Sequence, residues 1–187
     1  MIKNKADLME YLEEDRKALG KLKQRPSLLG DEIWKYQILL RKCEYFHNTK
    51  CQGVKRILKY YHRFRFHNLA VKLNYSIPLN TFNKGLSIAH YGCIAVNGGA
   101  QIGKYCRIHE GVTIGATGGS KKAATIGDHV FIGTGAKIIG DIQLEDNIVV
   151  GANAVVTKSF LEKGITIAGI PARKISNHDS KSFLQYG

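Results

Sequence analysis

Histidine is the side chain best suited to drawing a proton from a hydroxyl group near neutral pH, and this sequence contains seven. Two of the three in the C-terminal part that follows a six-residue repeat, His90 and His109, are candidates for this chemistry. His109 follows an aliphatic position, so we expect it at a corner facing solvent, where Glu110 beside it could orient the imidazole. His90 falls on the inward phase of the repeat, which on the pattern alone favours a hydrogen-bonded structural histidine.

A glycine-rich segment, ATGGSKKAAT at 116–125, is a second candidate for chemistry. The backbone amides around Gly118 and Gly119 could stabilise an oxyanion, because glycine lets a ligand approach the chain closely. Simple loop flexibility explains the same residues. Ile114 and Ile126 are two periods apart, so the segment predicts a loop that leaves a regular wall without disturbing its phase.

The repeat that must position these groups begins near Val96 and places a branched aliphatic residue at almost every sixth position. Its further members are Ile102, Ile108, Ile114, Ile126, Ile132, Ile138, Leu144, Val150 and Val156, with Ser120 as the exception. A period of six cannot form one stripe on an α-helix, which turns about 100° per residue. In a strand, positions two apart face the same way. The pattern therefore predicts a mainly β fold, a left-handed parallel β-helix with three short strands per turn, since hairpin turn signals are almost absent.

The N-terminal part reads as helices over 6–19, 31–47 and 53–72, with Asn4 as an N-cap of the first. The third helix carries apolar residues roughly on one side: Val54, Ile57, Tyr61, Phe64 and Val71. We therefore expect a helical region at 1–75, a β-helix domain at 76–175 and a polar tail at 176–187.

Charge is unevenly distributed along the 187 residues, whose formal net charge is +13. Residues 1–75 contain 17 Lys and Arg against 8 Asp and Glu, which favours an anionic partner. In 53–72 Tyr and Phe alternate with cations, as on helices that lie on membrane surfaces, although a solvated face fits equally. A nucleic-acid motif does not accompany the charge, so we expect no nucleic acid.

The sequence also bears on the cellular location of the protein and on whether it binds a metal. The N-terminus lacks a signal-peptide core, so we expect a cytoplasmic protein, in peripheral contact with the inner membrane face if 53–72 binds lipid. The four cysteines stand singly, which predicts free thiols and argues against a zinc ribbon. We expect no metal.

The hexad pattern, AHYG at 89–92, NGGAQIG at 97–103, the glycine-rich loop and AGIPARKI at 168–175 together resemble the hexapeptide acyltransferase superfamily. The likeness is greatest to the serine acetyltransferase branch and its relatives in polysaccharide gene clusters. It covers residues 76–175 closely and the helices loosely. The resemblance implies acetyl-CoA as co-substrate and a homotrimer with active sites between neighbouring chains. The short N-terminal region favours a lone trimer.

The resemblance also implies roles for particular residues. His90 matches the catalytic histidine, the general base for direct attack of an acceptor hydroxyl on acetyl-CoA, and His109 would assist it or bind the acceptor. The cofactor would lie along a groove formed by Gly133, Thr134, Gly135, Gly151 and Ala152. Its phosphates would meet Arg173 and Lys174.

Three departures from the family pattern affect the acceptor. Tyr75 and Ala89 stand where the serine enzymes carry carboxylates near the histidine, and Ala123 stands near a further expected histidine. These changes favour a sugar or polysaccharide-precursor hydroxyl, free or lipid-linked. The alternatives are a serine O-acetyltransferase that makes O-acetyl-L-serine for cysteine synthesis, a non-catalytic β-helix scaffold, and a membrane- or nucleic-acid-binding protein with a vestigial site.

Overall fold

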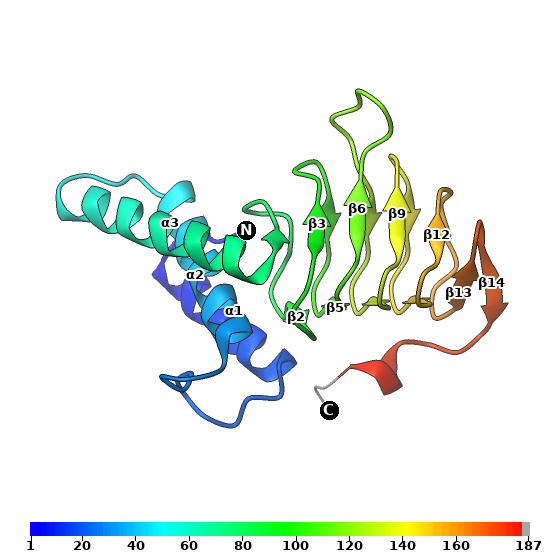
Figure 1. The fold of residues 1–187 in the computed structure, drawn as a ribbon, viewed down its shortest axis with the longest axis horizontal. Coiled ribbons are helices and arrows are strands. Elements are labelled where there is room, and N and C mark those ends of the chain that lie inside the picture. Colours follow the sequence, from blue (N-terminus) through cyan, green and yellow to red (C-terminus); the bar gives the residue numbers. More distant parts are fainter. Residues whose placement is uncertain (185–187) are drawn as a thin grey trace.

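Three helices precede a triangular β-prism in the computed structural model, which describes residues 1–184 (Figure 1). The helices are α1 (Lys5–Ala18), α2 (Glu32–Asn48) and α3 (Val54–Leu73), each within about two residues of its predicted range. Asn4 caps α1 as expected, since its side chain accepts a 2.9 Å hydrogen bond from the Asp7 amide. None of the described helices is both long and apolar enough to cross a lipid bilayer.

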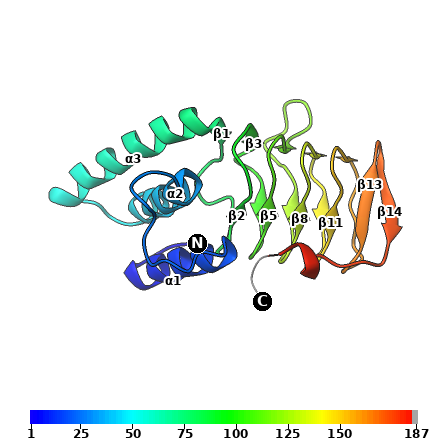
Figure 2. The ribbon, with the colours of Figure 1, turned by 60° about the horizontal axis from the view of Figure 1, so that its bottom comes forward.

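Within the described residues, fourteen short strands wind into three largely parallel sheets, one on each wall of the prism (Figures 1 and 2). Sheet A contains β1 (Tyr75–Ser76), β3 (Ile94–Val96), β6 (Thr113–Gly115), β9 (Lys137–Ile139) and β12 (Val155–Val156). Sheet B contains β4 (Gln101–Ile102), β7 (Thr125–Ile126) and β10 (Gln143–Leu144). Sheet C contains β2 (Ser87–Ile88), β5 (Arg107–Ile108), β8 (Phe131–Ile132), β11 (Val149–Val150), β13 (Thr166–Gly169) and β14 (Ala172–Ser176). The predicted left-handed parallel β-helix is confirmed, with an antiparallel β13–β14 pair closing its C-terminal end.

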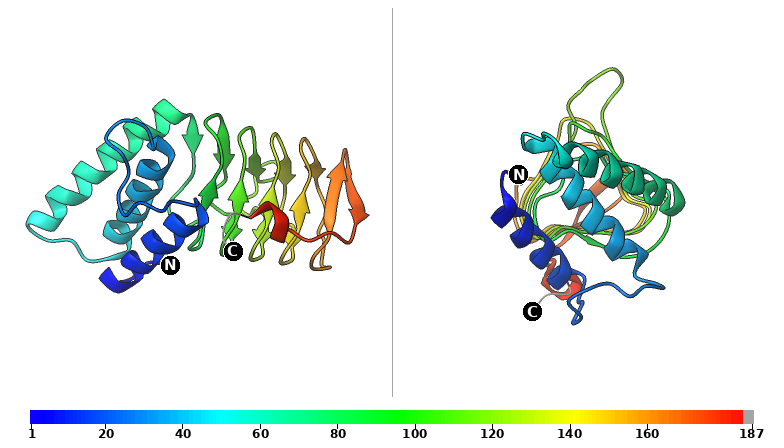
Figure 3. Two further views of the ribbon diagram at one scale, coloured as in Figure 1. Left: turned by 90° about the horizontal axis from the view of Figure 1, so that it is seen from below. Right: turned by 90° about the vertical axis from the view of Figure 1, so that its left-hand side faces the viewer.

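The repeat residues stack in columns inside the prism. Ile108 pairs with Ile88 below it and Ile132 above it, and all three side chains are buried. Burying one such side chain stabilises the fold by about 1.5–3 kcal/mol, so the columns form a continuous core. Seen from the helical end, the walls overlay as one closed outline (Figure 3).

The six-residue period does not extend back to His90, and the predicted inward position of this residue is wrong. Ile88 pairs with Ile108 and Val96 with Ile114, so the chain uses eight residues from Ile88 to Val96, where the next coil uses six from Ile108 to Ile114. The two extra residues enlarge the corner at 89–93. His90 therefore lies on this corner with its side chain exposed, outside the apolar lumen.

The glycine-rich segment forms the predicted loop. Ile114 pairs with Ile138, 24 residues later, whereas Ile138 pairs with Val156 after the regular 18. The six additional residues leave the wall between β6 and β7 and project beyond the outline of the prism (Figure 1). Gly118 and Gly119 are exposed on this loop.

A buried ion cluster joins the helices to the first coil of the prism. Arg41 of α2 is fully buried and contacts Asp15 of α1 at 2.8 Å and Glu44 at 2.9 Å. The same guanidinium donates to the carbonyl oxygens of Phe82 (2.9 Å) and Asn83 (2.7 Å). These bonds fix the orientation of α1 and α2 against the coil that leads to His90.

The C-terminal segment runs back along the prism after β14 (Figure 3). A short 3-10 helix, Lys181–Phe183, places the Phe183 ring 4.8 Å from that of Phe131. The segment at 176–184 therefore covers part of sheet C, and residues 185–187 of the predicted tail lie outside the described chain. The four cysteines are free thiols.

Candidate functional site

The corner between sheets C and A, which we name the C–A corner, carries most of the predicted site. It consists of residues 89–93, 109–111, 133–135 and 151–153 in successive coils, each following a strand of sheet C. Backbone hydrogen bonds link the levels: the Gly111 amide donates to Cys93 at 2.7 Å and the Gly135 amide to Glu110 at 2.9 Å. Residues that are up to 64 positions apart in the chain thus form one line parallel to the prism axis.

Two imidazoles meet on this corner. The rings of His90 and His109 lie 5.3 Å apart between centroids and nearly perpendicular, at 77°. His109 also packs edge-on against Phe131 at 4.9 Å, so its side chain is only 18% exposed and the expected solvent-facing position is wrong. Phe131, one coil further along, covers the ring. Burial, with Arg107 and His90 nearby, lowers the pKa of His109 and keeps its imidazole neutral at neutral pH.

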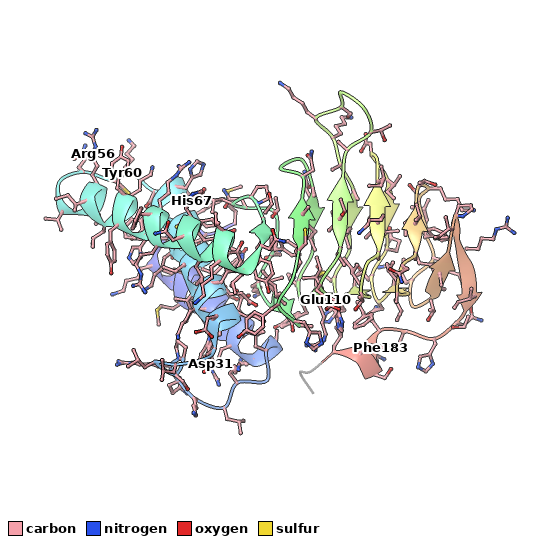
Figure 4. All side chains as sticks on the ribbon, viewed as in Figure 1. Asp31, Arg56, Tyr60, His67, Glu110 and Phe183 are labelled. Atoms are coloured by element: carbon pink, nitrogen blue, oxygen red, sulfur yellow. The ribbon has the colours of Figure 1, made fainter. Side chains whose placement is uncertain are left out.

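Glu110 completes the cluster with a carboxylate (Figure 4). One of its oxygens accepts a 2.9 Å hydrogen bond from the Thr134 hydroxyl. The other, Oε2, is buried without a hydrogen-bond partner among the described residues and lies 4.0 Å from His109 Nδ1. Hydrogen bonds from its own backbone amide and from Thr134 lower the pKa of Glu110, so the carboxylate is ionised.

Side-chain donor atoms of His90, His109 and Glu110 all lie within 4.8 Å of one another. Within residues 1–184 this is the one group of three whose spacing could hold a metal ion. The same spacing suits proton transfer equally well, because an ionised carboxylate stabilises an imidazolium at this distance.

Tyr75 takes a different role from the carboxylate expected at its position. Its buried ring packs against Tyr36 at 5.0 Å, and its hydroxyl donates a 2.8 Å hydrogen bond to the backbone oxygen of His90. It therefore holds the enlarged corner in place and leaves the imidazole untouched. Glu110 supplies the carboxylate near the imidazoles in its place.

A pocket of about 260 Å³ opens beside His90 between the prism and the helices. Its wall includes Tyr91 and Arg107 from the prism and Lys21, Asp31 and Trp34 from the helical region. Lys21 and Asp31 form an ion pair at 2.6 Å, and this pair with the Ser27 amide lowers the pKa of Asp31 to about 2. The pocket is thus polar at its rim and carries both signs of charge.

Sequence reasoning missed Lys21, Asp31, Trp34 and Arg107 as pocket residues. They come from three separate segments, and only the docking of α1 and α2 on the prism brings them to His90. A six-residue repeat contains no signal for that docking.

The predicted cofactor residues divide into two groups. Gly133, Thr134, Gly135, Gly151 and Ala152 lie on the C–A corner directly after the imidazoles. The glycines are also required by the coils themselves, since a Cβ at Gly133 would lie 2.9 Å from the Ala152 nitrogen. Arg173 and Lys174 lie apart, on β14 at the C-terminal end of sheet C, where Lys174 pairs with Glu162 at 2.6 Å.

Gly118 and Gly119 are not brought to His90 in this chain. Their loop leaves the corner between sheets A and B, the A–B corner, so the whole wall of sheet A separates it from the C–A corner. In Figure 1 the loop projects at the top, whereas Glu110 lies at the bottom in the same view (Figure 4).

Comparison with known proteins agrees with the resemblance in the sequence. The family model of the bacterial transferase hexapeptide (six repeats) matches residues 123–158. A serine acetyltransferase of Synechococcus elongatus is 37% identical over 100 residues, covering 52% of this chain and 41% of the relative. One of Helicobacter pylori is 38% identical over 101 residues, covering 53% and 58%. The chain spans less than two thirds of the length of these relatives.

Solved structures extend the likeness to the helices. A serine acetyltransferase in complex with cysteine superposes with a TM-score of 0.72 at 24% identity, covering 95% of this chain and 68% of the other. A serine acetyltransferase of Brucella abortus in complex with coenzyme A gives 0.69 at 25% identity, covering 93% and 70%. The predicted resemblance to hexapeptide acyltransferases of the serine acetyltransferase type is confirmed in sequence and in fold.

Proposed function

We propose that this hexapeptide-repeat chain is an acetyl-CoA-dependent O-acetyltransferase in which His90 is the general base. The observation that carries the proposal is the cluster of two imidazoles and an ionised carboxylate on an exposed corner, beside a pocket. The similarity to a serine acetyltransferase solved with coenzyme A supports the choice of co-substrate. A hydroxyl is a weak nucleophile until a base removes its proton, and a neutral imidazole performs this step near pH 7.

In the reaction, a ring nitrogen of His90 takes the proton of the acceptor hydroxyl as its oxygen attacks the thioester carbonyl. The tetrahedral intermediate collapses to the acetyl ester, and the coenzyme A thiolate leaves and receives the proton from the imidazolium. His109 and Glu110 stabilise the positive charge that His90 carries between these steps. The C–A corner at 133–135 and 151–153 would hold the pantetheine arm, with Arg173 and Lys174 facing the phosphates.

Serine is the acceptor that the comparisons favour, because the most similar relatives reported above carry the name serine acetyltransferase. The charges around the pocket agree with this choice. A zwitterionic amino acid needs cations for its carboxylate and an anion for its ammonium group, and Arg107, Lys21 and Asp31 offer both. The sugar acceptor expected from the sequence therefore becomes the second candidate.

Two observations keep the sugar acceptor in consideration. Tyr75 and Ala89 replace the carboxylates expected beside the histidine, and Tyr91 leaves 57% of its surface exposed at the pocket. An exposed aromatic ring can pack against the apolar face of a sugar.

We further propose that the active form is a homotrimer with sites between chains. The oxyanion loop with Gly118 and Gly119 lies on the A–B corner, and the imidazoles lie on the C–A corner. Both can act on one thioester only if the A–B corner of one chain meets the C–A corner of its neighbour. A three-fold arrangement of prisms repeats this contact and closes it.

A thiol-release assay with acetyl-CoA tests the activity and the acceptor together. We expect turnover with L-serine to exceed turnover with free sugars, and His90→Ala to reduce kcat by about 10²- to 10⁴-fold. His67→Ala, which removes an exposed histidine from α3, is the matched control and should retain full activity. Equal rates for wild type and His90→Ala would refute the proposal, and faster turnover with a sugar would replace serine as the acceptor.

A further inference from the structure

The outward face of α3 carries an apolar surface that the rest of the described chain leaves uncovered. Ile57, Phe64 and Val71 are 70%, 66% and 67% exposed, and Tyr60 and Tyr61 are 60% and 51% exposed. Single exposed apolar residues are ordinary, but these five recur at helical intervals of three, four and seven residues and share one side of the helix. We name them the apolar stripe of α3.

The opposite side of α3 packs against the rest of the protein. Phe66 stacks on Tyr36 at 5.2 Å, and His62 stacks on Phe46 at 5.5 Å. Leu73 is buried in the core. Because each residue turns the helix by about 100°, these residues and the apolar stripe point in opposite directions. Arg56, Tyr60 and His67 accordingly point away from the molecule in Figure 4.

Cations border the apolar stripe on both sides. Helical geometry places Arg56 and Arg63 along one edge and Arg65 and Lys72 along the other, and all four are exposed. Arg65 lies over the Tyr61 ring at 5.6 Å and donates to its hydroxyl at 3.2 Å. The helix Val54–Leu73 contains six Lys and Arg and no Asp or Glu. Such a face complements a flat surface that is apolar below and anionic at its rim.

We propose that the apolar stripe of α3 and its bordering arginines and lysine dock this protein on a bilayer of anionic phospholipid. The stripe enters the boundary between headgroups and acyl chains, and the cations meet the phosphates. A two-fold pairing of this face with the same face of a second copy fits less well, because it would bring two sets of unneutralised cations together. Nucleic acid also fits less well, since its phosphates would face the apolar centre of the stripe.

Vesicle co-sedimentation of the full chain tests the proposal, with vesicles of phosphatidylcholine alone and of phosphatidylcholine mixed with phosphatidylglycerol. We expect binding to the mixed vesicles that weakens with salt, and little binding to phosphatidylcholine. Ile57→Ser/Phe64→Ser and Arg56→Gln/Arg63→Gln should each lower the partition coefficient by about tenfold or more. All four side chains are exposed, so far-UV circular dichroism should show that α3 is intact.

Two matched controls remove similar groups from the exposed loop between α1 and α2. Leu28→Ser/Leu29→Ser removes two leucines that are 93% and 89% exposed, and Lys23→Gln/Arg25→Gln removes two exposed cations. Both controls should bind the mixed vesicles like the wild type. If the control and α3 variants lowered the partition coefficient equally, the proposal would be overturned, because net charge or non-specific hydrophobic adsorption would then explain binding.

Three other results would also overturn it. Binding that does not depend on the phosphatidylglycerol content of the vesicles would contradict a role for the cations. Failure to bind vesicles, together with disulfide-linked pairs of Tyr61→Cys chains, would assign the stripe to a second copy. Failure to bind vesicles, together with salt-sensitive binding of an RNA or DNA duplex, would assign it to nucleic acid. Lipid-free acetyl transfer should be unaffected by the α3 variants, so this test stands apart from that of the catalytic proposal.

Discussion

At the scale of single residues, the carboxylate of Glu110 and the imidazole of His109 set the chemistry available to His90. Glu110 keeps one oxygen without a hydrogen-bond partner among the described residues, on the side where the imidazoles lie. Leaving a buried charged oxygen unsatisfied costs stability. In an enzyme, that cost is offset when a positive charge forms beside the carboxylate during turnover.

Glu110→Gln should separate this role from a structural one. The amide keeps the size of the side chain and can still accept from Thr134, but it no longer stabilises an imidazolium. We expect kcat to fall by roughly 10- to 100-fold, and the acid limb of the pH profile to move to lower pH, because removal of an anion lowers the pKa of a nearby histidine. Glu13→Gln on the surface of α1 is the control. An unchanged pH profile would show that Glu110 only supports the corner.

His109 predicts a pH dependence of stability. Its folded-state pKa lies below the ordinary value of 6.5, so the unfolded chain binds a proton more readily as the pH falls. The neutral His109 ring therefore makes its full contribution to folding stability above about pH 6.5. That contribution is lost progressively as the pH falls and the unfolded chain takes up the proton. Urea unfolding at about pH 7.5 and pH 5.5 should show a smaller loss at acid pH for His109→Asn than for the wild type. His178→Asn, which changes an exposed histidine, should lose as much as the wild type does.

At the scale of elements, the buried Arg41 cluster decides how the helices meet the prism. Arg41 contacts Asp15 on α1, Glu44 on α2 and two carbonyl oxygens of the first coil. Asp15 in turn accepts from the Gly85 and Leu86 amides at 2.8 and 2.9 Å. Each partner is satisfied only if all three elements are in place, so the cluster couples the pocket wall to the corner that carries His90.

Arg41→Met should destabilise the protein by about 3–5 kcal/mol, because it leaves two buried carboxylates without their cation. Denaturant unfolding measures this loss. The triple variant Arg41→Met/Asp15→Asn/Glu44→Gln removes the stranded charges and should recover part of the stability. Arg25→Met, at an exposed position, should change stability by no more than about 0.5 kcal/mol. If Arg41→Met lost no more stability than the Arg25→Met control, a coupling role for the cluster would be contradicted.

At the scale of the whole molecule, the separation of the two corners makes the assembly part of the catalytic proposal. The loop and the imidazoles belong to opposite edges of sheet A, and a rigid β-helix does not fold to bring them together. The prism grows along its axis, so a single chain presents long, nearly flat walls, on which a deep cleft needs a second surface.

Mixing two inactive variants tests this arrangement. His90→Ala lacks the proposed base, and Gly118→Asp/Gly119→Asp places carboxylates where, on this proposal, the oxyanion is stabilised. If each site combines His90 of one chain with the loop of another, co-refolded mixtures should regain activity, because some sites unite the intact parts. Refolded single variants are the controls. Mixtures no more active than these controls would place the complete site within one chain.

Some features of this protein follow from the order of its residues alone. Aliphatic side chains at every sixth position allow one packing solution, so the β-helix and the loop that keeps its phase were predictable. The three helices were predictable from the helical spacing of apolar residues in the N-terminal part. The approach of residues 109, 133 and 151 along one corner follows from the same period, since equal steps of 18 residues stack equal positions, and the loop adds whole hexads.

Other features were decided only by tertiary structure. The enlarged first corner turns His90 outward. The six-residue repeat predicts neither the register of β2 against β5 nor the packing of Phe131 over the ring of His109. The pocket needs Lys21 and Asp31 from a loop that α1 and α2 position through Arg41. Local periodicity determines which residues face inward within a coil. Contacts between segments far apart in the chain depend on the shapes of surfaces that exist only after folding.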